Sequence, residues 1–366
     1  MKARTALAAM TVLLALAVLT PIGRAKPTRK ILQWGWDEPD TAYMRRHLPE
    51  MERSPFDGCV FGVRHGPDGR SGSFTWGLWG RRRFAHEELS AAFEDLRALR
   101  PVRFRELFLR VNVTPGDVAW FEDFSPVLSN LRLAAELARA GRARGILLDV
   151  EQYQGQVFEF GAQPLSSAYG WDAYAAQVRG RGREIMAALQ EGYPGLTVFL
   201  TFGHSLPFVL SDGGRRPLAE THYGLLAPFL DGLVEAARGG TRIIDGYELS
   251  YGFREPSQFV EARRLVREGV LPIVGPREAY RQRVRLAFGL WLDYDWRRYG
   301  WYPDDPQKNY FTPAGFERSL GTAIAESDEY MWVYGESARW WNTSEAPASV
   351  PAWYAAVLRR VRGFAP

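Results

Sequence analysis

The sequence is poor in cysteine and has little excess charge of either sign. Its one cysteine, Cys59, cannot form an internal disulfide, and it lies in an apolar run where burial would suppress the reactive thiolate. Lys and Arg total 46 against 42 Asp and Glu, a formal charge of +4. Three of the basic residues fall in the first 25 positions with no acid, so the remainder carries about +1 (4 − 3). This balance argues against nucleic acid as a partner, because such proteins carry a basic footprint.

Long apolar runs are absent except at the N-terminus. Two basic residues are followed by the apolar run 6–19 and by a small-x-small site that ends at Ala25. This order predicts a signal peptide over residues 1–25 and a mature domain over 26–366. The apolar run is short for a membrane span. We therefore expect a secreted or periplasmic protein with no membrane contact after cleavage.

Several catalytic motifs are also missing. The five histidines show neither H-x-H nor H-E-x-x-H spacing, so we predict no metal. No G-x-S-x-G elbow of a serine hydrolase is present, and no glycine-rich phosphate loop follows the first strand-like run. The sequence therefore predicts no cofactor.

What the sequence does contain is an alternation of strand-like and helix-like segments. Short apolar runs typical of buried parallel strands occupy 30–36, 56–63, 104–113, 144–150, 196–203, 243–251, 285–294 and 329–336. Amphipathic segments follow them at 40–54, 85–99, 124–141, 171–192, 224–239, 256–269, 312–327 and 350–363. Eight such pairs predict an α/β fold, a single-domain (β/α)8 TIM barrel, with an open doubly wound sheet as the rival.

The fourth run, "GILLDVE", ends in two carboxylates. Because alternate residues of a strand share a face, Asp149 and Glu151 should project side by side at its C-terminal end. Neighbouring carboxyls raise each other's pKa, so one can stay protonated as a general acid. The second carboxylate needed for glycoside cleavage remains open between Glu248 and Asp293, and Asp149 with Glu151 alone would suit attack by a substrate acetamido group.

Aromatic and polar residues gather at the other predicted strand ends, where barrels of this kind place their active sites. Indole faces can stack on sugar rings while polar groups bind hydroxyls, so we predict a carbohydrate substrate. The predicted subsite walls are Trp34, Trp36, Trp291, Trp332, Trp340 and Trp341. The other predicted binding residues are Asp37, His65, Asn112, Tyr153, His204, Tyr247, Tyr251, Tyr334, Glu336 and Arg339.

These residues resemble the (β/α)8 glycoside hydrolases. "GILLDVE" is similar to the end of the chitinase-like signature D-G-x-D-x-D-x-E, with Gly145, Asp149 and Glu151 matching and with Arg144 and Leu147 in place of acids. The resemblance implies that Glu151 is the general acid, that Asp149 orients the acetamido group and that the sixth-strand Tyr247 assists.

Two further likenesses are weaker in their motifs. The layout is similar to the large retaining clan with a fourth-strand acid/base and a seventh-strand nucleophile, but Val150 replaces the usual Asn and strand seven offers only aspartates. The run "EYMWVYGESARWW" resembles uncharacterised secreted barrel proteins of the glycosidase type. We thus expect a secreted glycoside hydrolase. The alternatives are a barrel that binds carbohydrate without catalysis and a secreted structural protein.

Overall fold

The structure is a computed structural model that describes residues 29–69, 71–343 and 347–363. The predicted signal peptide, residues 1–25, lies outside this part of the chain.

The strands form a parallel barrel. They are β1 (Lys30–Gly35), β2 (Gly58–Phe61), β5 (Phe108–Asn112), β6 (Gly145–Asp149), β7 (Thr197–Leu200), β8 (Arg242–Asp245), β9 (Val284–Leu286), β10 (Phe288–Trp291) and β11 (Tyr330–Gly335). Their order in the sheet is β10-β11-β1-β2-β5-β6-β7-β8-β9, so the first strand lies beside the last. Every pairing between these strands is parallel.

The seventh barrel position is filled by two short strands. Only Ala287 separates β9 from β10, and its N–H donates to the Asp245 carbonyl at 2.8 Å. β9 pairs with β8 and β10 pairs with β11, so the two pieces join the ends of the nine-stranded sheet. Counting them as one position gives eight (9 − 1), which confirms the predicted (β/α)8 barrel and excludes the open sheet.

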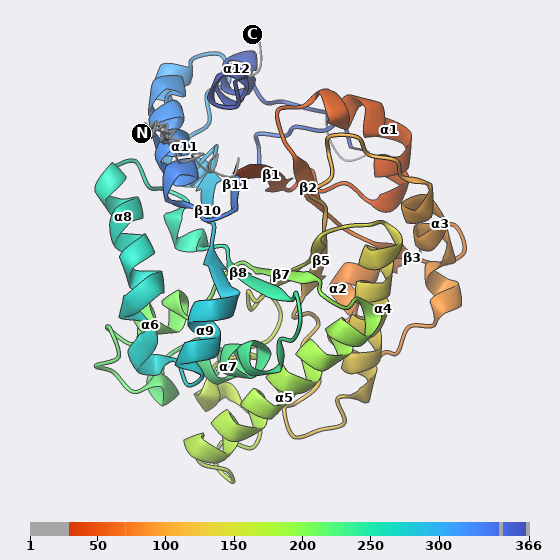
Figure 1. Cartoon of the computed structure of the whole chain (residues 1–366), viewed down its shortest axis with the longest axis vertical. Coiled ribbons are helices and arrows are strands. Elements are labelled where there is room, and N and C mark those ends of the chain that lie inside the picture. Colours follow the sequence, from red (N-terminus) through yellow and green to blue (C-terminus); the bar gives the residue numbers. More distant parts are fainter. Residues whose placement is uncertain (1–28, 70, 344–346, 364–366) are drawn as a thin grey trace, which may run out of the picture.

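Helices surround the barrel in a ring (Figure 1). The eight that follow barrel strands are α1 (Thr41–Arg53), α3 (Ser90–Ala98), α4 (Ser125–Ala140), α5 (Trp171–Gly192), α7 (Leu226–Ala236), α8 (Pro256–Arg264), α11 (Pro313–Glu326) and α12 (Ala352–Val361). They match the eight amphipathic segments of the sequence. The shorter α2 (Phe74–Gly77), α6 (Ser205–Leu210), α9 (Arg277–Arg283) and α10 (Trp296–Tyr299) lie in the connections.

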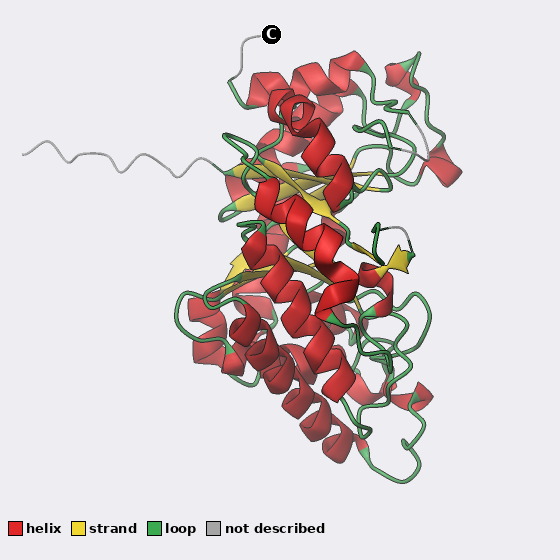
Figure 2. Ribbon diagram, turned by 90° about the vertical axis from the view of Figure 1, so that its right-hand side faces the viewer, coloured by secondary structure: helices red, strands yellow, loops and turns green. Residues whose placement is uncertain are grey.

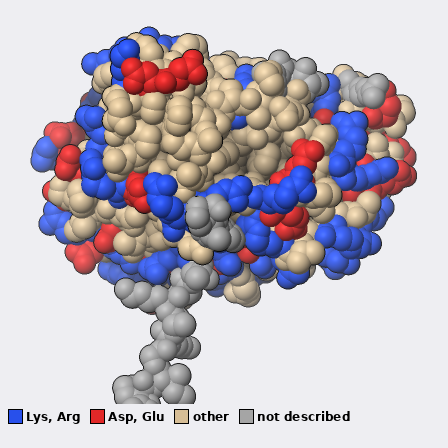
Figure 3. Space-filling view, turned by 90° about the horizontal axis from the view of Figure 1, so that it is seen from above, with Lys and Arg blue, Asp and Glu red and all other residues tan. Residues whose placement is uncertain are grey.

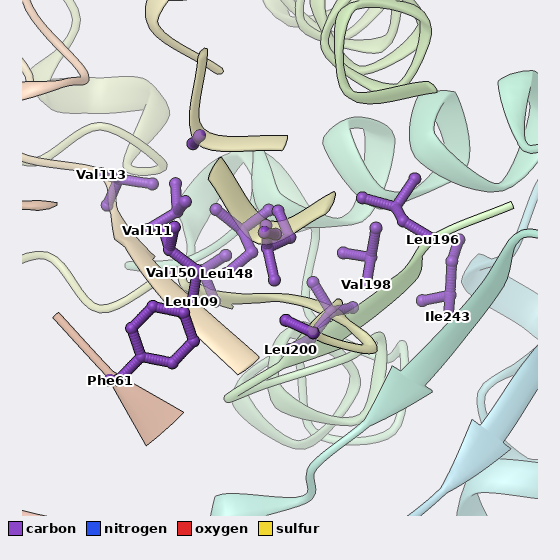
Figure 4. Packing of buried hydrophobic residues seen from close by; sticks show 14 of the residues in the cluster. Phe61, Leu109, Val111, Val113, Leu148, Val150, Leu196, Val198, Leu200 and Ile243 are labelled. Carbon is purple, nitrogen blue, oxygen red and sulfur yellow. The ribbon is translucent and has the colours of Figure 1, made fainter. Parts of the chain in front are cut away.

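Two cores follow from the alternation of side chains along the strands. The inner core fills the barrel and comprises Leu32, Trp34, Val60, Phe108, Leu147, Phe199, Ile244, Ala287, Tyr330 and Trp332. The outer core lies between strands and helices and includes the intervening residues, such as Leu109, Leu148 and Val198 (Figure 4). Cys59 belongs to this outer core, is fully buried and has a pKa raised well above its usual value by burial, which fits the prediction of a core residue.

The long loops gather on one side of the barrel, together with the small antiparallel pair β3 (Arg64–His65) and β4 (Gly72–Ser73) (Figure 2). This is the side on which the barrel strands end, because Arg64 follows β2 in the chain. The flank seen in Figure 3 carries basic and acidic side chains interspersed around a broad uncharged area. No helix in the described part of the chain is both long and apolar enough to cross a membrane.

Candidate active site

A cleft of about 640 Å³ opens at the C-terminal ends of β1, β2, β5, β6 and β11. Barrel enzymes carry their catalytic groups at this end. Aromatic and charged side chains dominate its lining. They include Trp34, Trp36, Glu38, Asp40, Arg46, Arg64, Trp76, Arg110, Glu151, Tyr153, Tyr334 and Arg339.

Asp149 ends β6 on the inner face of the barrel and is fully buried. Its Oδ2 accepts hydrogen bonds from Asn112 Nδ2 at 2.8 Å and from the Tyr153 hydroxyl at 3.1 Å, and its Oδ1 accepts the Glu151 N–H at 3.1 Å. Burial and the nearby Glu151 charge raise the pKa of Asp149 to about 7, against the lowering effect of Arg110. Asp149 therefore holds the Glu151 backbone and the Tyr153 ring in place. Asn112 takes part by holding Asp149.

Glu151 and Glu248 form a hydrogen-bonded carboxyl pair beside Asp149. Glu151 lines the cleft, whereas Glu248 is not among the lining residues and its Oε2 is buried. Burial, followed by the charges of Glu151 and Asp149, raises the pKa of Glu248 well above its usual value. Burial also raises the pKa of Glu151, and the hydrogen bond from Glu248 reduces this rise. These shifts describe a protonated Glu248 that donates a hydrogen bond to Glu151.

Glu248 owes its place to a sharp turn after β8. Tyr247, the residue before it, adopts a left-handed conformation with φ of 43°, which is rare for a bulky residue. The Asp245 carboxylate accepts the Tyr247 N–H at 3.0 Å and so holds the turn. The Tyr247 ring itself packs on Phe288 and is buried. Tyr247 therefore positions the glutamate, and the structure does not bring it into the cleft as predicted.

Tyrosines and tryptophans form the floor of the site. Tyr251 donates a hydrogen bond to Glu248 and stacks on Tyr334 with ring centroids 5.1 Å apart. Trp332 lies beneath Trp34, at 5.2 Å between centroids, and its indole donates to the Gly246 carbonyl. Only 1% of Trp332 is exposed, so it supports the floor and is not the predicted subsite wall.

Glu38 is a further carboxylate in the lining of the cleft. Its Oε2 lies 2.7 Å from Arg110 Nε and accepts the Trp34 indole N–H at 3.1 Å. Arg110 Nη1 reaches to within 4.0 Å of Asp149, and the guanidinium also stacks on the Trp76 ring at 4.6 Å. Arg110 therefore links a carboxylate of the first strand end with the carboxyl cluster of the fourth.

Aromatic side chains form the walls of the cleft. Trp36 is 52% exposed and donates its indole N–H to the Tyr334 hydroxyl. Trp76 meets the half-exposed Tyr153 edge-on at 5.1 Å. Trp34, Trp36, Tyr153 and Tyr334 thus all line the cleft. Trp291, a predicted subsite wall, is not among the residues that line the cleft, and its ring contacts Tyr251 and Tyr334.

Asp293 lies away from the pair formed by Glu151 and Glu248. Its carboxylate accepts the N–H groups of Glu336, Ser337 and Ala338 and the indole N–H of Trp291. Three of these donors belong to the turn after β11, and the fourth is the ring of Trp291 on β10. The Asp293 carboxylate is therefore engaged with these groups, and the expectation that it could be the partner of Glu151 was wrong. Glu336 is held by Arg297 at 2.8 Å and by the Trp296 indole at 2.9 Å, outside the lining of the cleft.

Asp37, Trp340 and Trp341 form a buried clasp behind the cleft. Asp37 accepts the N–H groups of both tryptophans, and burial raises its pKa to about 6. The Trp341 indole donates to Gln33, and the Trp340 ring packs on Phe56 at 4.7 Å. These three residues therefore join the ends of β1 and β11 and do not face a ligand, in contrast to the prediction.

The two predicted histidine ligands also lie elsewhere. His204 is buried, and its Nε2 lies 3.1 Å from Asp231 on α7, outside the barrel. His65 packs edge-on against Phe84 at 5.1 Å, and burial lowers its pKa. Apolar packing and ion pairing account for both residues.

The residues of the cleft that were not predicted include Arg110, Glu38 and Trp76. Arg110 is a charged residue on the inward face of a buried strand, between Phe108 and Asn112, and that alternation is a signal in the sequence. Glu38 follows the first strand closely, but nothing in the sequence distinguishes it from Asp37. Trp76 lies in a connecting segment without hydrophobic periodicity, so no pattern in the sequence marks it as a site residue.

Metal-ligating side chains do not cluster in the described part of the chain. No group of three or more His, Cys, Asp or Glu residues there is placed to hold an ion.

Comparisons with known proteins identify no family for this chain. No family model matches it, and no curated protein matches its sequence. Among solved structures, the chain is similar to the apo form of the 3-keto-D-glucoside 4-epimerase YcjR from E. coli. The TM-score is 0.42 at 15% identity, over 92% of this chain and 99% of the other. A likeness this distant does not indicate a shared activity.

Proposed function

We propose that the protein is a glycoside hydrolase in which Glu151 is the general acid. One observation supports this above the others: a cleft-lining glutamate with a raised pKa lies beside two further carboxyls in a cleft walled by indole and phenol rings. The residues 1–25 also lead us to propose that the enzyme acts outside the cytoplasm.

The general acid must carry a proton near neutral pH and must be reachable. Glu151 is reachable because its side chain lines the cleft, and we propose that the proton it shares with Glu248 supplies the acid, since burial raises the pKa of both groups. It would protonate the glycosidic oxygen as the bond to the anomeric carbon breaks. Glu248, hydrogen-bonded behind it, would share a proton with it, and Asp149 would orient its backbone.

For the second carboxylate we propose Glu38. It lines the same cleft, and its contact with Arg110 at 2.7 Å fixes the position of its carboxylate there. Its carboxylate would attack the anomeric carbon, or direct water to it, as the leaving oxygen takes the proton of Glu151. Water would then supply the hydroxyl of the released sugar, and its proton would return to Glu151.

The test compares Glu151→Gln and Glu38→Gln with the wild-type protein on a panel of glycans, by release of reducing ends. Each substitution should lower turnover by about a thousandfold or more while the melting temperature changes little. Glu94→Gln, on an exposed face of α3, is the matched control and should retain full activity. Wild-type turnover that survives Glu151→Gln would refute the acid assignment.

A second candidate function, binding of carbohydrate without catalysis, is favoured by one observation. The Glu151 carboxyl is already engaged by Glu248 and Tyr153, as in a structural cluster. Saturable saccharide binding with no turnover of any glycan would support this function over hydrolysis.

A further inference from the structure

The lining of the cleft carries more basic than acidic side chains. Four arginines line it, Arg46, Arg64, Arg110 and Arg339, against the acids Glu38, Asp40 and Glu151. Glu38 is neutralised by Arg110. The Asp40 side chain caps helix α1 by accepting the Tyr43 N–H at 2.7 Å. The acids of the cleft are therefore engaged with groups of the protein.

Two of these arginines have no acidic partner within the described residues. Arg46 lies exposed on α1 and forms no ion pair there, whereas its neighbour Arg45 pairs with Asp95 at 2.9 Å on the side away from the cleft. Arg339 has a buried Nη1 atom with no hydrogen-bond partner in the part of the chain that is described. A buried guanidinium N–H without an acceptor is costly, and a ligand oxygen would satisfy it.

From this distribution we propose that the cleft binds an anionic saccharide, one that carries carboxylate or sulfate groups. The inference rests on the proposed function and names its substrate class. Guanidinium groups bind both kinds of anion with paired N–H donors, and a concave site with an excess of positive charge concentrates anionic ligands. The aromatic walls of Trp36 and Trp76 would take the sugar rings, while Arg46 and Arg339 take the charges.

The test measures binding by calorimetry in the Glu151→Gln protein, so that turnover does not interfere. The probes are neutral, uronate-bearing and sulfated oligosaccharides of equal length. An acidic series should bind at least about tenfold more tightly than the neutral one, and the difference should shrink between about 50 and 300 mM salt. The uronate and sulfate arms show which anion the site takes.

Arginine variants locate the effect. Arg46→Gln and Arg339→Gln should each weaken binding of the acidic ligand about tenfold and leave the neutral ligand unchanged. Arg45→Gln is the matched control on the same helix and should change nothing. Equal binding of acidic and neutral ligands, or acidic binding that survives both variants, would overturn the inference.

The outcomes separate this inference from the proposed function. Cleavage of neutral glycans without a preference for acidic ones overturns the inference and leaves hydrolysis standing. Tight acidic binding by the wild-type protein, with no cleavage of that ligand, supports the inference and overturns hydrolysis.

Discussion

Two groups of buried carboxyls stand at the strand ends of this barrel, and they differ in what surrounds them. Asp37 and Asp293 each accept several backbone N–H groups from the chain that follows β11. Asp149, Glu151 and Glu248 instead lie against one another. Burial raises the carboxyl pKa in both groups, but backbone donors oppose that rise for Asp37 and Asp293, whereas neighbouring carboxyl charges add to it for Asp149 and Glu248. The first group therefore holds the fold together, and the second stores a proton at the cost of stability.

The comparison shows why position alone does not identify a catalytic acid. All of these residues follow an apolar run, and all lie at the same end of the barrel. The partners of each side chain decide its role, so substitutions in the two groups should have opposite effects on stability.

The largest effect on stability is expected from Asp293→Ala. Its loss leaves the N–H groups of Glu336, Ser337 and Ala338 in the turn after β11 without this acceptor, and we expect the free energy of unfolding to fall by about 3 kcal/mol. Urea unfolding measures this change. Asp304→Ala, at an exposed position nearby, should have no effect. A change below about 1 kcal/mol for Asp293→Ala would contradict the view that the first group of carboxyls stabilises the fold.

Glu248→Gln should have the opposite sign. Because the pKa of Glu248 is raised in the folded state, that state binds a proton that the unfolded state has lost above about pH 4.5. Wild-type stability therefore falls as pH rises through and beyond that value, and the amide removes this loss. The variant should match the wild type near pH 4 and be more stable by about 1 to 3 kcal/mol at about pH 8. Urea unfolding at both pH values checks it, and a variant less stable at the higher pH contradicts it.

The smallest effect is expected from Arg110→Met, and it concerns the pH profile. The Arg110 charge lowers the pKa of both Asp149 and Glu151, so its removal should raise both values. The alkaline limb of kcat/KM should then move upward by about one pH unit, since the acid keeps its proton longer. Arg110→Lys retains the charge and should keep the limb in place. If the alkaline limb does not move in Arg110→Met, the Arg110 charge does not affect the pKa of the catalytic acid, which contradicts the prediction.

The architecture could be predicted from the sequence because it depends on local patterns. Each buried strand is a short apolar run, and each helix has one apolar face, as in α4 and α11, which begin at Ser125 and at Pro313 within the predicted segments 124–141 and 312–327. The interruption at Ala287 could not be foreseen, because nothing in "RLAFGLWLDY" distinguishes two short strands from one.

The site could be predicted only where it is local. The two-residue spacing brings Asp149 and Glu151 together, although β6 ends at Asp149 and Glu151 lies beyond the strand. The partnership of Glu151 with Glu248, 97 residues later (248 − 151), depends on the turn at Tyr247, which has no sequence signature. The clustering of tryptophans was a poor guide in the run after β11, because Trp340 and Trp341 pack against Phe56 in the outer core.

The pairing of β1 with β11 has a consequence for how this chain is made. The first barrel strand reaches the ribosome exit some 300 residues before the partner that covers one of its edges, since their register joins Lys30 to Tyr330. During synthesis, the backbone polar groups of that edge have no strand to pair with until β11 has been made. Asp37 likewise cannot accept the N–H groups of Trp340 and Trp341 until they have been made. Truncation before β11 therefore leaves a nascent chain with an open flank, which is a natural target for chaperones.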